Sequence, residues 1–135
     1  MSTSENKKSV VPVPCPFCGM PPTRIVAEDG PCIAFRDGFP VSEGHTLIIP
    51  RRHVPSFRDL TPEEWAAIHR LARHLADDLL GSDSTIRGFN FGLNDGACAR
   101  QSVFHCHAHL IPRRDGDHPC PRGGVRAVIP SKANY

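Results

Sequence analysis

The chain has 135 residues, which suits one ordinary domain, and 39% of them are hydrophobic, enough for a core. The formal net charge of +2 argues against a strongly basic surface for nucleic acid or anionic membranes. No stretch reaches the roughly 18 apolar residues that cross a bilayer, and the first residues lack a secretory signal. We therefore expect a cytoplasmic protein without a nucleic-acid or membrane partner.

The first half of the chain predicts a tail, a knuckle and three strands. Residues 1–11 are polar without periodicity, so we expect a disordered tail followed by a single domain over 12–135. Residues 15–24 are rich in cysteine, proline and glycine and predict a tight knuckle. Apolar runs at 25–27, 32–35 and 46–49 have strand character and are separated by turn residues.

The second half predicts one helix and two further strands. Thr61 is a good N-cap, Pro62 suits the first helical position, and Glu64 completes a capping box. Apolar residues then recur at helical spacing up to a stop at Gly81: Trp65, Ile68, Leu71, Ala72, Leu75 and Leu79. Strands are expected at 88–93 and 104–111, and the rest from Arg113 onward should be mostly irregular. The pattern predicts an α+β domain with one sheet and one main helix.

The six cysteines favour a metal or redox pair over a set of disulfides. Cys15 and Cys18 form a C-x-x-C pair, and the others are isolated: Cys32, Cys98, Cys106 and Cys120. A chain without a secretory signal is expected to keep its thiols reduced. The redox interpretation is weaker because no thioredoxin-like βαβ pattern surrounds the pair.

The segment His105-Cys106-His107-Ala108-His109 has three alternating histidines. On a strand, all three imidazoles share one face, and the residues between them can pack under the helix. Neutral imidazole is both a nucleophile near pH 7 and a metal ligand, so the rings can converge on a small anionic group. A metal site or a surface patch of histidines is the alternative.

The sequence around this segment resembles the histidine-triad family. HCHAHLI (105–111) is similar to the motif His-φ-His-φ-His-φ-φ, in which φ is apolar. DGFPVSEGHTLIIPRRHVPSFRDL (37–60) resembles the family's N-terminal half-site, and NDGACARQSVFH (94–105) resembles the segment that leads into the triad. PRGGVRAVIP near the C-terminus is similar to the tail of bacterial members. The resemblance covers most of the chain from Cys15 onward and points to the branch of bacterial dinucleoside polyphosphate hydrolases with a C-x-x-C zinc site.

This resemblance implies an antiparallel sheet of about five strands, a homodimer and a set of catalytic roles. His107 is implied to attack the α-phosphorus of a nucleotide and form a nucleotidyl-histidine intermediate, which water or another acceptor resolves. Its other ring nitrogen needs a fixing partner that the sequence does not identify. The supporting residues are His45 in the proton network, Ser102 as proton donor to the leaving group, Gln101, Asn94 and His109 at the phosphates, and Asp37 at the ribose hydroxyls.

Two further points follow from the resemblance. Many family members with an N-terminal C-x-x-C bind zinc through four positions, which here are Cys15, Cys18, His53 and His105. Four protein ligands leave no open position, so this zinc is expected to be structural. Arg100 stands where the family usually has glycine, and it either narrows the pocket or adds a cation for a longer phosphate chain.

Three functions are compatible with these features. The first is a hydrolase of dinucleoside polyphosphates or nucleoside phosphoramidates. The second is a nucleotidyltransferase or phosphorylase of the same superfamily, whose members tend to be longer. The third is a non-catalytic, zinc-stabilised nucleotide-binding module, against which the intact His107, Gln101 and Ser102 count. We expect the hydrolase.

Overall fold

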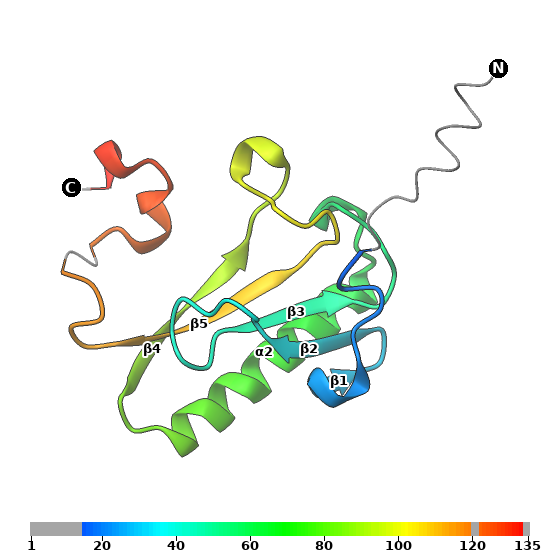
Figure 1. The fold of residues 1–135 in the computed structure, drawn as a ribbon, viewed down its shortest axis with the longest axis horizontal. Coiled ribbons are helices and arrows are strands. Elements are labelled where there is room, and N and C mark those ends of the chain that lie inside the picture. The colour runs from blue at the N-terminus through cyan, green and yellow to red at the C-terminus, as the bar shows by residue number, and fades with distance from the viewer. Residues whose placement is uncertain (1–14, 120–121, 134–135) are drawn as a thin grey trace.

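The computed structural model describes residues 15–119 and 122–133, so the expected tail at 1–11 lies outside the described residues. Five antiparallel strands form one sheet in the order β1-β2-β3-β5-β4 (Figure 1). The strands are β1 (Ile25–Asp29), β2 (Cys32–Arg36), β3 (Thr46–Pro50), β4 (Ile86–Leu93) and β5 (Ala108–Arg114). The described residues contain one α-helix, α2 (Pro62–Ser82), which packs against one face of this sheet. The predicted α+β architecture is confirmed.

The start of α2 is held by the capping box that the sequence predicts. The Thr61 hydroxyl accepts a hydrogen bond from the Glu64 backbone N–H, and the Glu64 carboxylate accepts one from the Thr61 N–H. The Arg52 guanidinium donates to both carboxylate oxygens of Glu64, at 3.0 and 2.9 Å. The segment after β3 is thereby tied to the first turn of the helix.

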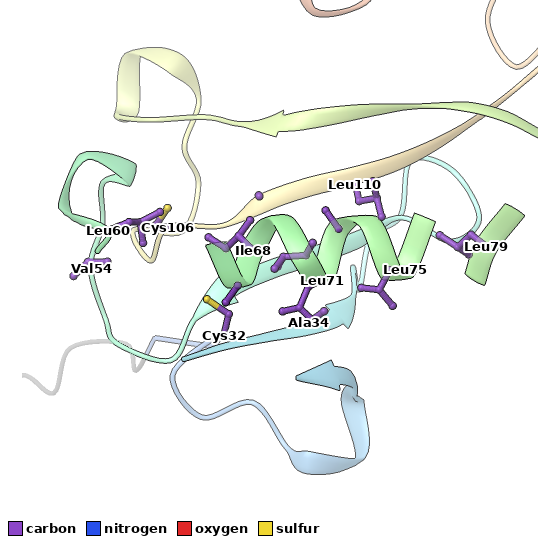
Figure 2. Close-up of a cluster of buried hydrophobic side chains, with 14 of the residues drawn as sticks. Cys32, Ala34, Val54, Leu60, Ile68, Leu71, Leu75, Leu79, Cys106 and Leu110 are labelled. Carbon is purple, nitrogen blue, oxygen red and sulfur yellow. The ribbon is translucent and has the colours of Figure 1, made fainter. Parts of the chain in front are cut away.

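Hydrophobic side chains pack on both faces of the sheet. The apolar face of α2 packs against the sheet, with Cys106 and residues of the strands in the same cluster (Figure 2). The buried apolar helix residues are Ala67, Ile68, Leu71, Ala72, Leu75 and Leu79, whereas Trp65 is 40% exposed and contacts Phe57. A second cluster covers β2 and β3 on the opposite face and consists of Ile33, Phe35, Leu47 and Ile49, with Phe17, Met20 and Ile25 packed on it. The cysteine knuckle therefore lies on the face of the sheet that α2 leaves open.

The last strand begins later than its sequence predicts. Residues 104–107 are not part of the ladder, and β5 starts at Ala108 and continues to Arg114. The reason is that the Cys106 N–H donates to the Val54 carbonyl of the preceding loop, at 2.7 Å, and not to a neighbouring strand. The alternation nevertheless extends through this segment, because Cys106, Ala108 and Leu110 all belong to the helix-side core.

The segment after β5 has little regular secondary structure, as the sequence predicts. The chain after β5 forms short 3-10 turns at Gly124–Val128 and Pro130–Lys132. The five cysteines within the described residues are free thiols, and Cys120 lies outside those residues. No helix in the described part of the chain combines the length and apolarity needed to span a membrane.

Candidate active site and metal cluster

Three imidazoles and a carboxylate form a continuous row beside β3 and β5. His45 directly precedes β3, and His109 of β5 lies beside Leu47 of that strand. The His45 Nε2 atom is 2.9 Å from His109 Nδ1, and the His107 and His109 rings are 5.1 Å apart. Asp37 extends the row, with its Oδ2 atom 3.5 Å from His45 Nε2. Four predicted site residues therefore come together from three separate segments.

The geometry around His107 fixes which ring nitrogen carries the proton. His107 is 5% exposed, and its Nδ1 atom lies 2.9 Å from the His105 carbonyl oxygen. A carbonyl oxygen only accepts hydrogen bonds, so Nδ1 must be the protonated nitrogen. The neutral ring then has its lone pair on Nε2, which is the atom available to attack an electrophile. The fixing partner that sequence analysis did not identify is thus a main-chain carbonyl two residues away.

The same reasoning assigns the protons of His45 and His109. The Val41 N–H donates to His45 Nδ1 at 3.2 Å, so His45 carries its proton on Nε2. That proton is donated to His109 Nδ1, the nearer of its two possible acceptors. His109 must then be protonated on Nε2 and offers this N–H as a donor beside His107. One nucleophilic nitrogen and one hydrogen-bond donor therefore lie on neighbouring imidazoles.

The segment between β4 and the triad is a turn that is closed by hydrogen bonds of two predicted site residues, Gln101 and Asn94. The Gln101 side chain is 5% exposed, and its Oε1 accepts from the Gly96 N–H at 2.8 Å. Its Nε2 donates to the Pro55 and Val103 carbonyls, at 2.8 and 3.2 Å, so Gln101 holds the turn in place. Asn94 Nδ2 donates to the Ala99 carbonyl, whereas Ser102 is exposed. The role of Gln101 and Asn94 as phosphate ligands stays a prediction.

A second cluster brings together the four predicted metal ligands. The nearest ligand atoms of Cys15, Cys18, His53 and His105 all lie within 4.8 Å of one another. His105 Nδ1 is 3.5 Å from both cysteine sulfurs, and His53 Nδ1 is 3.1 Å from Cys18 Sγ. A tetrahedral zinc with ordinary Zn–S and Zn–N bonds separates S and N ligands by about 3.5 Å. His105 donates its Nε2 proton to the Pro50 carbonyl at 2.8 Å, so its Nδ1 lone pair faces the cluster.

Comparison with known proteins places this arrangement in a family. The profile of the HIT domain matches residues 19–116, most of the chain. The chain belongs to the histidine-triad (HIT) family. Adenylylsulfatase HINT3 of Arabidopsis thaliana is 37% identical over 110 residues, which are 76% of this chain and 54% of that protein. The chain therefore spans about half the length of this relative.

Solved HIT structures share the fold. A Zn-bound histidine triad family protein from Mycobacterium smegmatis is 36% identical with a TM-score of 0.69, over 77% of this chain and 78% of that one. A histidine triad nucleotide-binding protein from Candida albicans is 32% identical with a TM-score of 0.66, over 75% of this chain and 76% of that one. The HIT-like fold predicted from the sequence is confirmed.

One further contact in this HIT protein involves a residue that sequence analysis did not select. Phe17, between the two cysteines of the knuckle, packs edge-on against His107 with ring centroids 5.1 Å apart. It also contacts Phe35 at 5.3 Å and His105 at 6.0 Å. Phe17 therefore connects the cluster of predicted metal ligands to the triad. Its position inside the C-x-x-C motif was the only available signal.

The pKa of His109 predicts how the stability of this HIT protein depends on pH. Burial, together with His107 and His45, lowers the pKa of His109 to about 4. The unfolded imidazole takes up a proton as the pH falls below about 6.5, whereas the native one stays neutral until about pH 4. The stability contributed by neutral His109 is complete above pH 6.5 and is lost between pH 6.5 and 4.

We expect acidification from pH 7 to 5 to lower the free energy of unfolding by about 1–2 kcal/mol more in the wild type than in His109→Asn. Urea titrations of both proteins at the two pH values measure this difference. Effects of acid on groups distant from His109 are common to both proteins and cancel. An equal loss of unfolding free energy in the two proteins would contradict the lowered pKa of His109.

Proposed function

We propose that this HIT protein is a nucleotide hydrolase that cleaves dinucleoside polyphosphates or nucleoside phosphoramidates at the α-phosphorus. The observation that carries the proposal is the 2.9 Å bond from His107 Nδ1 to the His105 carbonyl, which leaves Nε2 as the nucleophile. In the first step an Nε2–P bond forms, and the leaving group departs with the electron pair of its bond to phosphorus. In the second step water attacks the phosphorus, breaks the P–N bond and releases the nucleoside monophosphate.

The neighbouring groups have complementary roles in this proposal. His109 donates its Nε2 proton to a phosphate oxygen, and His45 keeps His109 in the required tautomer. Ser102, which is exposed beside the fixed Gln101, passes a proton to the leaving group. Asp37 retains carboxylate lone pairs for the ribose hydroxyls in addition to its bond from the Phe39 N–H. Asn94 and Gln101 contact the phosphates or position the turn that does.

We also propose that Cys15, Cys18, His53 and His105 bind one structural zinc ion. Two thiolates and two imidazoles are a common ligand set for closed tetrahedral zinc sites, and their spacing fits such an ion. The name of the M. smegmatis relative, which describes it as Zn-bound, supports this proposal. The zinc would fix the position of His105, whose carbonyl holds His107. Homodimer formation also stays a prediction.

The test of the hydrolase is incubation with three adenylyl compounds, followed by chromatography. Diadenosine tetraphosphate, adenosine phosphoramidate and adenylyl sulfate, the last chosen from the name of the Arabidopsis relative, are the probes. We expect AMP from the substrates that are cleaved, and in ¹⁸O-labelled water the AMP phosphate should acquire the label, because water attacks the histidine-bound phosphorus.

The alternatives give different products. Addition of inorganic phosphate should leave AMP as the product, whereas ADP in its place would identify a phosphorylase. Binding without any product would identify a nucleotide-binding module and contradict the proposal.

A further inference from the structure

Arg100 has a backbone conformation that is costly for its residue type. Its φ and ψ angles are 71° and 27°, in the left-handed region. Among the described residues it is the one non-glycine residue with positive φ. Such conformations are uncommon outside glycine, asparagine and aspartate, and they persist where the surrounding structure imposes them. Strained residues of this kind cluster at active sites and ligand-binding segments.

Hydrogen bonds on both sides of Arg100 impose this conformation. The Arg100 N–H donates to the Ala97 carbonyl at 2.9 Å, and the Gln101 N–H donates to the Gly96 carbonyl at 3.1 Å. The Gln101 side chain and Asn94 close the turn from its two ends, as described above. Arg100 is therefore held between Asn94 and Gln101, two residues before Ser102. Figure 1 shows this turn, in yellow, between the end of β4 and the segment leading to β5.

The Arg100 guanidinium is exposed and makes no hydrogen bond or ion pair with the described residues. Most other arginines are engaged; Arg51, Arg52, Arg70 and Arg113, for example, are paired with carboxylates. The acidic residue of the same turn, Asp95, does not neutralise Arg100. Its carboxylate accepts hydrogen bonds from the Ser56 hydroxyl and the Phe57 N–H, both at 3.3 Å. Among residues 15–119 and 122–133, Arg100 is thus a cation without a counter-charge.

We propose that Arg100 binds the anionic leaving group of the substrate and makes the site selective for polyphosphates. This inference rests on the proposed hydrolase function. When the bond between phosphorus and a bridging oxygen breaks, the electron pair stays on that oxygen and adds negative charge to the departing polyphosphate. A guanidinium stabilises this charge through paired N–H donors. Ammonia, the leaving group of a phosphoramidate, develops no negative charge and gains nothing from the cation.

The charges at the two ends of the site favour one orientation of the substrate. The carboxylate of Asp37 lies at the His45 end of the row, where it repels phosphate and suits ribose hydroxyls. His107 lies at the opposite end of the row, and Arg100 belongs to the turn that precedes His107 in the chain. The nucleoside would therefore lie toward Asp37 and the leaving polyphosphate toward Arg100.

The test compares two substrates in three variants. Arg100→Asn removes the charge but tolerates the left-handed conformation, and Arg100→Lys keeps a charge. Arg73→Asn is the matched control, because Arg73 is an exposed arginine of α2 that also has no partner in the described chain. Steady-state kcat/KM is measured for diadenosine tetraphosphate and for adenosine phosphoramidate, at low and high NaCl concentration.

We expect Arg100→Asn to lower kcat/KM for the tetraphosphate by about 10- to 100-fold, the effect of one charge-assisted hydrogen bond. The phosphoramidate value should stay within about twofold, Arg100→Lys should retain most of the selectivity, and Arg73→Asn should change neither value. Salt should inhibit tetraphosphate cleavage more in the wild type than in Arg100→Asn.

Two results would overturn the inference while leaving the hydrolase intact. One is an equal loss for both substrates in Arg100→Asn, which would show a role in the turn alone; the other is no loss for either. If the wild type cleaved neither substrate, the proposed function would be overturned, and the inference with it.

Discussion

Replacement of His107 by asparagine is expected to lower kcat by at least about 10³-fold with little loss of fold. Asparagine has no nitrogen lone pair to attack phosphorus, so the covalent route is closed. Its amide N–H₂ can still donate toward the His105 carbonyl, the bond that His107 Nδ1 makes. Initial rates on the preferred substrate, together with thermal melting of the variant, measure the two parts of this prediction.

The matched control is His69→Asn. His69 is an exposed histidine of α2 on the far side of the sheet from the triad, and its replacement should leave kcat unchanged. If His107→Asn kept more than a few per cent of wild-type activity, His107 would not be the nucleophile. His107→Gly offers a positive test, because free imidazole can occupy the space left by the ring and restore part of the attack.

Chemistry distinguishes His107 from the other nucleophile nearby. Ser102 is exposed, and the structure gives its hydroxyl no basic partner among the described residues. A rapid quench without acid should trap nucleotide on a peptide containing His107, through a P–N bond that is labile in acid and more durable in alkali. An adduct on Ser102, or one that is stable in acid and labile in alkali, would contradict the mechanism.

The sequence predicted features that depend on local patterns. The capping box of Thr61 and Glu64 and the alternation of Cys106, Ala108 and Leu110 are each encoded within a few residues, and the structure contains both. The resemblance to HIT proteins supplied what local patterns do not, namely that a residue as distant in the chain as Asp37 is expected near the histidines, and the structure places it 3.5 Å from His45.

The sequence did not predict features set by the main chain of distant segments. The tautomer of His105 depends on the Pro50 carbonyl, and the late start of β5 depends on the Val54 carbonyl, neither of which has a residue signature. The contact of Phe17 with His107 depends on how the knuckle packs on the sheet. The left-handed conformation of Arg100 is imposed by hydrogen bonds around a non-glycine residue, against its intrinsic preference.

The second large effect is expected on removal of the proposed zinc ion. Purified protein should contain about one zinc per chain, and Cys18→Ser should lose it, because the hydroxyl is a poor zinc ligand. Zinc that binds only the folded chain stabilises it by mass action, so its loss should cost several kcal/mol and lower Tm by roughly 10–20 °C. Cys98→Ser is the control, since Cys98 is exposed and outside the metal cluster. Metal analysis and thermal melting of the three proteins measure both quantities.

Loss of zinc should also change the position of His107, through contacts that the structure contains. His105 uses its side chain as a proposed metal ligand and its carbonyl to hold His107 Nδ1, so a displaced His105 releases the nucleophile from its fixed tautomer. Phe17, carried by the same knuckle, would lose its contact with the His107 ring. Cys18→Ser should therefore have a lower kcat even when it is assayed well below its own melting temperature. Added zinc should restore neither activity nor Tm in this variant, because a ligand is missing. If metal-free wild-type protein melted at the same temperature as the zinc-bound protein, the structural role would be ruled out. Recovery of Tm and kcat when zinc is added back to the metal-free wild type would support it.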